Sequence, residues 1–252
     1  MITTIKQELF KFWHQRIPLY GVMALLLLML EATFSRPITP RIIAQGFGLG
    51  QWTLLIIITL SSPFLSMEYK NNTICTMFYK SSSKSYIYLS KYFIVIGYGI
   101  FLLLLGLALT IFLKITIVGD KYSWNMIYQN HHSLLTTLLL NLIGNGLYLF
   151  FMVSLCFMLI SIVKINVAVI GLGMAIGFIG NSLSGIIMTA FPNMSFIWKW
   201  NPLNMINIIN QLPKPNNIAI SQLSNLQIII GVIVDTLIFL GLGYWLFKKR
   251  RV

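Results

Sequence analysis

Two acidic residues lie inside long apolar runs of this sequence, Glu31 and Asp235. A charge at the centre of a bilayer costs about 2.5–3.5 kcal/mol on insertion scales, so an acid kept there is a candidate for binding an ion or a cationic group. At about 1.5 Å per helical residue, Glu31 lies roughly 6 Å below Ser35, and Asp235 lies roughly 12 Å below Gln227. We therefore expect both acids near the outer ends of their helices, where they could line one vestibule for a cationic cargo. The alternative is a structural role, in which Glu31 reaches the outer interface or pairs with Arg36, and Asp235 forms a hydrogen bond with a neighbouring helix.

Amides and glycines form two further patterns at four-residue spacing. Asn141 and Asn145 make a polar stripe on one helix face, which lines either a transport pathway or the interior of a bundle. Gly173, Gly177 and Asn181 share one face of another helix. Small residues at this spacing allow close helix approach, and the amide could donate a hydrogen bond to a second helix. The contact would form within one chain or across a dimer.

The sequence lacks the residue patterns that most common enzyme mechanisms require. The sequence has no G-x-x-x-x-G-K-[ST] loop for ATP, no H-E-x-x-H and no G-x-S-x-G. Five acidic residues leave little scope for paired carboxylates, and neither the two cysteines nor the three histidines are spaced as metal ligands. We therefore expect no catalytic residue, no metal and no cofactor site in this chain.

The composition is that of a membrane protein. Hydrophobic residues make up 57% of the chain and charged residues 9%, against about 25% charged in soluble domains. The net charge of +13 would suggest nucleic acid in a soluble protein, but the basic residues here flank apolar runs, where they orient helices. We expect an all-α polytopic protein with a single transmembrane domain over residues 1–252, and no nucleic-acid binding.

Six apolar runs are long enough to cross a bilayer as helices. The fourth and fifth are separated only by Lys164, so the chain must turn there. The six predicted spans are Ile17–Phe34, Gly46–Ser66, Tyr92–Leu113, Leu134–Val163, Ile165–Phe191 and Gln227–Phe247.

The distribution of lysine and arginine predicts the orientation. With the N-terminus inside, inner segments hold twelve basic residues and outer segments six. This excess favours both termini in the cytoplasm of a multi-pass membrane protein.

Residues 2–16 have the pattern of an amphipathic helix. Such a helix would lie in the inner membrane interface as an elbow before the first span. Pro18 marks the expected turn into that span, and Glu8 interrupts any signal-peptide core. The apolar face has Ile2, Ile5, Leu9, Phe12 and Trp13, and the polar face has Lys6, Gln7, Lys11 and Gln15.

A polar segment, residues 67–91, separates the second and third spans, with Glu68 near its start and Lys91 at its end. Within it we expect a short helix that a serine run at 81–83 stops. Its exposed apolar side chains would suit a groove on another protein, whereas the alternative is a solvated basic loop. The residues of this helix are Asn72, Thr73, Cys75, Thr76, Met77, Phe78 and Tyr79.

The outer segment 192–226 contains Trp198, Trp200 and Asn201-Pro202, with short apolar pieces between prolines. Tryptophan favours the membrane interface, and irregular backbone at that depth must be packed on protein or wetted. We expect re-entrant helices here.

Together these features resemble the type-2 ABC exporter permease family. Glu68, Asn72-Thr73, the stretch 80–84 and Lys91 occupy the places of that family's first cytoplasmic loop, with Asn72 where glycine is usual and serines where proline is usual. The Trp200-Asn201-Pro202 segment is similar to the re-entrant helices before the last span.

The resemblance implies a fold with an elbow helix and six spans, and a separate ATPase subunit that binds ATP and Mg²⁺. That subunit would dock on residues 72–79, the coupling helix, and on the elbow helix. The permease would pair with a second copy or a sister permease. General similarity points to the permeases that export or expel antimicrobial peptides in Gram-positive bacteria, so an amphipathic or cationic peptide is the expected cargo.

Two other functions stay open at this point. One is an ion-coupled carrier or channel that uses Glu31 and Asp235. The other is an immunity protein that binds its ligand at the membrane without transport.

Overall fold

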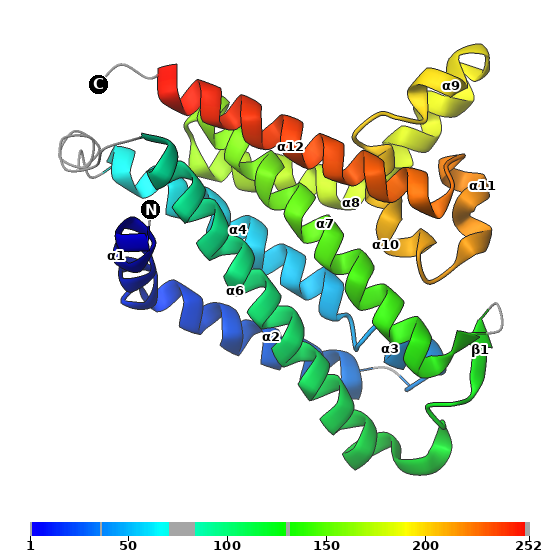
Figure 1. The fold of residues 1–252 in the computed structure, drawn as a ribbon. Helices are drawn as coiled ribbons and strands as arrows, with labels where there is room; N and C mark the ends of the chain where they lie inside the picture. The colour runs from blue at the N-terminus through cyan, green and yellow to red at the C-terminus, as the bar shows by residue number, and fades with distance from the viewer. Residues whose placement is uncertain (1, 36, 71–83, 130–131, 250–252) are drawn as a thin grey trace.

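The computed structural model describes residues 2–35, 37–70, 84–129 and 132–249 of the 252-residue chain. These residues form an all-α bundle in which six helices are long and apolar enough to cross a membrane (Figure 1). The multi-pass fold expected from the sequence is thereby confirmed. The six helices are α2 (Arg16–Phe34), α4 (Leu49–Lys70), α6 (Lys84–Leu113), α7 (Leu134–Val163), α8 (Asn166–Ala190) and α12 (Asn225–Lys249).

Shorter elements connect these helices. The strands β1 (Ile127–Gln129) and β2 (His132–Ser133) pair antiparallel before α7. The short helices are α1 (Ile2–Trp13), α3 (Pro40–Ala44), η1 (Lys114–Val118), η2 (Gly119–Lys121), η3 (Pro192–Met194), α9 (Ser195–Trp198), η4 (Asn204–Asn207), α10 (Ile208–Gln211), η5 (Pro215–Asn217) and α11 (Ile218–Ser221).

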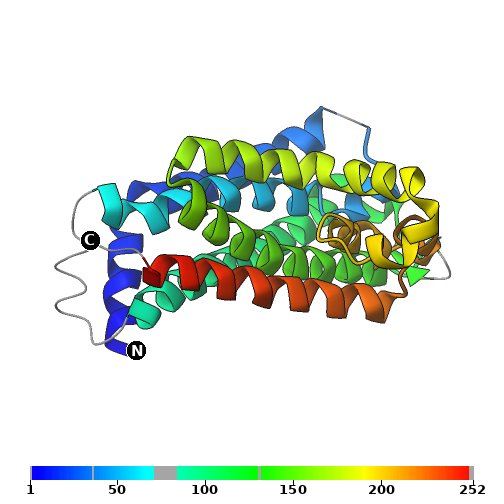
Figure 2. The same cartoon turned by 90° about the horizontal axis from the view of Figure 1, so that it is seen from above.

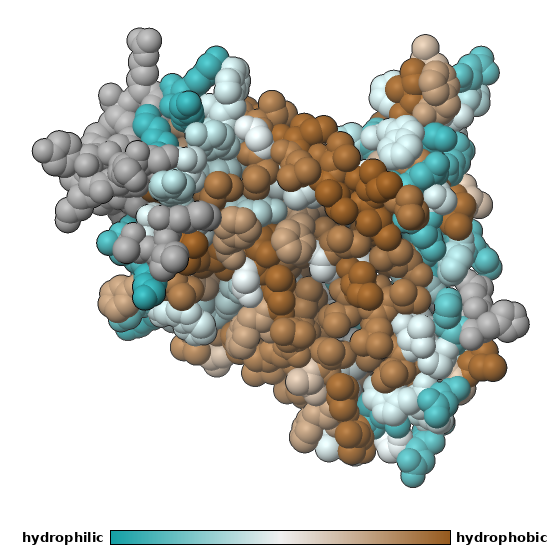
Figure 3. Space-filling model, viewed as in Figure 1, coloured by the Kyte–Doolittle hydropathy of each residue, from teal (hydrophilic) through white to brown (hydrophobic). Residues whose placement is uncertain are grey.

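Helices α4 and α7 form the centre of the bundle. About two thirds of each span is buried inside the chain, 67% for α4 and 61% for α7, against 22–28% for α2, α8 and α12. Those three outer helices therefore present mainly apolar side chains outward, and the surface shows a broad hydrophobic band between two polar ends (Figure 3). Such a band is the surface expected of a protein that lipid surrounds.

The two ends of the bundle differ in construction. At one end, which we call the proximal end, α1 lies across the spans almost at right angles to them (Figure 2). The same end holds the last turn of α4, the first turn of α6 and the α7–α8 turn. The opposite, distal end is built from α3, the β1–β2 hairpin and the short helices α9 to α11 (Figure 1).

The polar segment between the second and third spans is shorter than predicted. Helix α4 continues to Lys70, and α6 begins at Lys84 rather than at the predicted Tyr92. The early start of α6 follows from packing, because Ile87 and Tyr88 are buried, with the Tyr88 ring 5.6 Å from that of Phe157. The 30 residues of α6 measure about 45 Å, longer than a hydrocarbon core of about 30 Å. A helix of this length either tilts in a bilayer or extends beyond its hydrocarbon core.

Turns fix the other boundaries. Lys164 adopts a left-handed conformation (φ 64°) between α7 and α8, where the sequence predicts a tight turn. The elbow bend lies at residues 14–15, ahead of the predicted Pro18, which sits in the first turn of α2, where its missing N–H costs no helical bond. The second span begins at Leu49 rather than Gly46, because Gly46, Phe47 and Gly48 form a turn with positive φ.

Candidate functional site

A buried ion pair at the proximal end joins α1 to α6. Glu8 of α1 and Lys91 of α6 are both almost fully buried, and their Oε2 and Nζ atoms are 2.8 Å apart. The Lys91 ammonium also donates a hydrogen bond to the Phe64 carbonyl of α4 (3.0 Å) and lies 4.3 Å from the centre of the Phe64 ring. One cation thus links three helices that are far apart in sequence.

The Glu8 carboxylate serves a second lysine. Its Oε1 atom accepts a hydrogen bond from Lys11 Nζ at 2.9 Å, and Lys11 is partly exposed. Removing one partner of a buried ion pair costs about 3–5 kcal/mol, because the other charge is left without compensation in a medium of low dielectric constant. The shared carboxylate therefore holds the elbow helix firmly against the bundle.

Aromatic packing strengthens the same junction. The Phe12 ring lies edge-on to those of Phe64 and Tyr98, with 5.2 Å between centroids in each pair. The Tyr98 hydroxyl donates a hydrogen bond to the Pro18 carbonyl at 2.6 Å. The start of α2 is thereby fixed to the middle of α6, so α1, α2, α4 and α6 meet at one place.

The amphipathic pattern of α1 is divided differently from the prediction. Glu8 and Phe12 face the bundle, while Leu9, Phe10 and Trp13 stay 41–63% exposed. The exposed apolar side chains are the ones available to a membrane interface. The periodicity of the sequence did not predict that Glu8 pairs with another helix. The signal that could have indicated it is the position of this acid one helical turn before Phe12, on the same helix face.

The sequence predicts Lys91 as one flank of a coupling loop, and the structure shows its contacts with Glu8 and Phe64. The predicted coupling helix, residues 72–79, lies outside the described residues. Glu68 lies in the last turn of α4. Lys91 therefore lies on α6, the helix that follows this segment, and its ion pair with Glu8 joins that helix to α1.

Glu31 and Asp235 do not come together. Glu31 is exposed on α2, and Asp235 lies half-buried on α12, with its Oδ2 atom without a hydrogen-bond partner among the described residues. Helix α2 packs on α4 and α6, whereas α12 packs mainly on α7, and the two lie on opposite sides of the bundle (Figures 1 and 2). Within the described part of one chain, the two acids therefore share no vestibule.

The asparagine stripe of α7 faces the bundle interior. Asn141 Nδ2 donates hydrogen bonds to the carbonyls of Ala44 (2.8 Å) and Thr137 (3.1 Å). Asn145 lies against Gly50 of α4, where an added Cβ would overlap its carboxamide. These contacts favour the structural interpretation of the stripe over a pathway, although Asn141 also borders a distal pocket.

The glycines of α8 pack within the chain. A Cβ on Gly173 would lie 3.0 Å from Ile58 of α4, and the Gly177 carbonyl accepts a hydrogen bond from the Tyr148 hydroxyl at 3.2 Å. Asn181, predicted to bond another helix, forms no side-chain hydrogen bond within the part of the chain that the structure describes. The close approach thus occurs, and Tyr148 rather than Asn181 supplies the polar link.

Amide side chains hold together the segment between α8 and α12, which the sequence predicts to be re-entrant. Asn201 donates to Ser184 Oγ (3.0 Å), and Asn204 donates to the carbonyls of Lys199 (2.6 Å) and Ser221 (2.9 Å). Gln211 Nε2 then donates to the Leu223 carbonyl at 2.8 Å. These bonds satisfy irregular backbone inside the bundle end, which is the condition for such backbone at membrane depth.

Three glycines receive this segment. Gly144 of α7 lies under the backbone of α10, Gly180 of α8 lies against Ile206, and Gly231 of α12 lies against Met205. Each is a position where a side chain would collide with the segment, so the spans are shaped to accept it.

Comparisons of this chain with protein-family models, with curated proteins and with solved structures find no match. In the described residues there is no group of three or more His, Cys, Asp or Glu side chains that could hold a metal ion. The geometry therefore has to carry any functional proposal.

Proposed function

We propose that this chain is the membrane-spanning permease subunit of an ATP-driven exporter of the type-2 ABC class. The proximal end would face the cytoplasm, and a separate ATPase subunit would dock on residues 72–79 and on α1. The chain would act with a second copy or a sister permease in a bacterial plasma membrane.

The observation that carries the proposal is the Glu8–Lys91 ion pair. Helix α6 continues without a break from Lys84 into the membrane, so a force applied to the segment before it reaches the bilayer directly. The ion pair passes the same force to α1, and the Lys91–Phe64 bond passes it to α4. A transport subunit driven by a soluble motor needs a rigid junction of this kind.

The cargo follows from the sequence resemblance, which implies an amphipathic or cationic peptide. The ATP and Mg²⁺ would be bound by the partner, and this chain would contribute no catalytic residue.

The test is whether ATP hydrolysis and transport separate when the coupling helix is removed. The permease and its ATPase are reconstituted together, and residues 72–79 are replaced by a Gly/Ser linker of equal length. We expect ATP hydrolysis to persist and transport to fall to background, with the unfolding temperature of the permease unchanged. Transport that continues at the parent rate would contradict the proposal.

One observation favours a second candidate, an ion-coupled carrier. A carboxylate oxygen of Asp235 is buried on a membrane helix without a hydrogen-bond partner among the described residues. Asp235→Asn and Glu31→Gln separate the two functions. An ATP-driven exporter keeps transport near the parent rate in both variants, whereas an ion-coupled carrier loses it in Asp235→Asn.

A further inference from the structure

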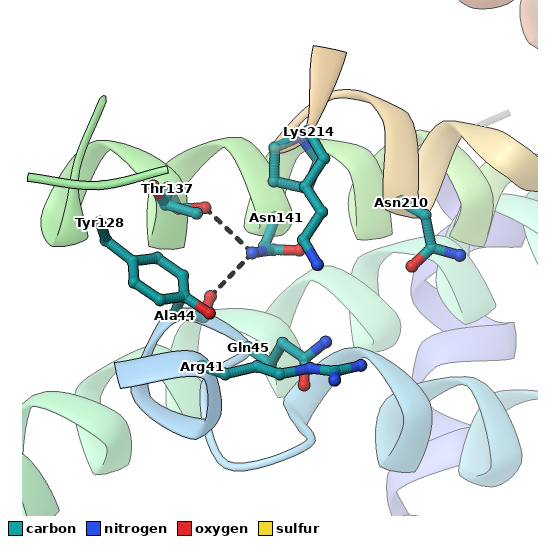
Figure 4. Close-up of a pocket in the computed structure, with 9 residues that line it drawn as sticks. Arg41, Ala44, Gln45, Tyr128, Thr137, Asn141, Asn210 and Lys214 are labelled. Atoms are coloured by element: carbon teal, nitrogen blue, oxygen red, sulfur yellow. Dashed lines mark hydrogen bonds between the residues drawn. The ribbon is translucent and has the colours of Figure 1, made fainter. Parts of the chain in front are cut away.

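A pocket at the distal end gathers positive charge from separate elements. It is a small hollow, open to solvent, between α3, β1, α7 and the segment after α10 (Figure 4). The polar side chains that border it and carry the argument are those of Arg41, Gln45, Tyr128, Asn141, Asn210 and Lys214.

The two cations of this pocket have no acid between them. Arg41 comes from α3 and Lys214 from the segment after α10, and none of the described residues that line the hollow is acidic. Among the described residues, neither side chain forms a salt bridge. Two like charges that face one hollow repel each other, and an anion between them would remove that repulsion. The proximal end shows the contrasting case, where Lys11 and Lys91 share the Glu8 carboxylate.

The neutral groups supply further donors. Burial raises the pKa of Tyr128, with Arg41 opposing the shift, so the phenol stays protonated at neutral pH and offers its O–H. Asn141 is fixed through its amide nitrogen by Ala44 and Thr137, with its oxygen on the side of Lys214 (Figure 4).

We propose that this pocket binds a phosphate group, carried by a lipid headgroup or by a soluble phosphate ester. The guanidinium, the ammonium and the phenol hydroxyl come from three different elements, and a phosphate group offers such donors several acceptor oxygens and up to about two negative charges. The pocket lies at one end of the membrane-length helices, and basic pockets between membrane helices bind phosphate-bearing headgroups. This inference does not depend on the proposed transport function.

The experiment measures binding to the purified full-length chain in a nonionic detergent by native mass spectrometry. The probes are phosphatidylglycerol, glycerol 1-phosphate, a glucosyl diacylglycerol without phosphate, and a fatty acid that offers only a carboxylate. Arg41→Gln/Lys214→Gln should weaken binding of a phosphate probe by at least about tenfold, the loss expected for one charge-assisted hydrogen bond. The matched control is Lys121→Gln/Lys199→Gln, which removes two positive charges from the same end outside the pocket lining and should leave the affinity unchanged.

The probes also distinguish the two sources of phosphate. Tight binding of phosphatidylglycerol alone assigns the pocket to a lipid headgroup, and binding of glycerol 1-phosphate assigns it to a soluble ester. The proposal is overturned if the parent chain prefers neither over the glucolipid, if the fatty acid binds as tightly as phosphatidylglycerol, or if the control variant loses as much affinity as the pocket variant. If the double variant does not fold, the single change Lys214→Gln, at a partly exposed side chain, gives the same comparison.

Discussion

At the proximal end of the bundle, Lys11 and Lys91 share the buried carboxylate of Glu8, whereas at the distal end Arg41 and Lys214 border a pocket without an acid. Charge that is paired and buried belongs to the framework, because separating it costs several kcal/mol. Charge that is exposed or partly exposed and has no acidic partner contributes little to folding and is available to a ligand. This difference motivates the two proposals, force transmission at the proximal end and phosphate binding at the distal end.

The two ends also differ in the length of their backbone elements. Long helices continue to the proximal end, and side-chain ion pairs join them there. At the distal end the chain breaks into short helices that asparagine and glutamine side chains hold together. Rigid elements suit a mechanical junction, and short elements allow several donors to converge on one hollow.

The largest effect should come from breaking the proximal pair. Lys91→Met leaves Glu8 partly uncompensated in the interior and should lower the free energy of unfolding by about 3–5 kcal/mol. Chemical unfolding in detergent, followed by tryptophan fluorescence, measures the change. Lys6→Met, at an exposed position on α1, is the matched control and should stay within about 0.5 kcal/mol.

A double variant sharpens this prediction. Glu8→Leu/Lys91→Met removes both buried charges, and Lys11 can turn to solvent, so most of the loss should be recovered. A double variant as unstable as the sum of the two single variants would show that the ion pair is not the link.

The next largest loss of stability is expected where α10 packs against Gly144 of α7. A Cβ at Gly144 would lie 3.2 Å from the Ile208 carbonyl oxygen, a backbone atom that cannot swing away, so Gly144→Ala should cost about 1–3 kcal/mol. Gly146→Ala on the same helix meets nothing within 4 Å and should be neutral or stabilising by up to about 1 kcal/mol. Equal unfolding temperatures for the two variants would argue against a closely fitted segment.

A smaller effect is expected from Tyr98→Phe at the proximal end. The change removes the hydrogen bond to the Pro18 carbonyl and should cost about 1 kcal/mol in unfolding free energy. Tyr20→Phe removes a hydroxyl from a side chain that is 56% exposed and serves as the control. If both variants match the parent chain, the bend between α1 and α2 does not need this bond.

The smallest effect on stability is expected at the distal pocket. Arg41→Gln/Lys214→Gln should change the free energy of unfolding by less than about 0.5 kcal/mol, because neither charge is paired with an acid in the described structure. The same unfolding assay measures it. A loss comparable with that of Lys91→Met would mean that the distal cations are structural and would remove the contrast between the ends.

The fold was largely accessible from the sequence. Runs of about 20 apolar residues define membrane helices almost alone, so the six spans and the turn at Lys164 follow from hydropathy. The start of α6 was missed, because Lys84 and Lys91 flank a stretch whose burial depends on partners in α7 and α12.

The sites were less accessible, because they depend on pairs distant in sequence. Glu8 and Lys91 lie 83 residues apart, and Arg41 and Lys214 lie 173 apart. Periodicity places a residue on a face of its own helix but does not say which helix that face meets. For the same reason Glu31 and Asp235, similar in depth, were expected together although their helices lie on opposite sides.

The central claim is that the proximal end is gripped by an ATPase, and purification of the tagged chain from native membranes in a mild detergent tests it most directly. The account predicts that a nucleotide-binding protein co-purifies with ATPase activity, and that a Gly/Ser linker in place of residues 72–79 abolishes the association, whereas Arg41→Gln/Lys214→Gln preserves it. A parent chain that purifies without any ATPase, or a linker variant that retains its ATPase in full, would contradict the account.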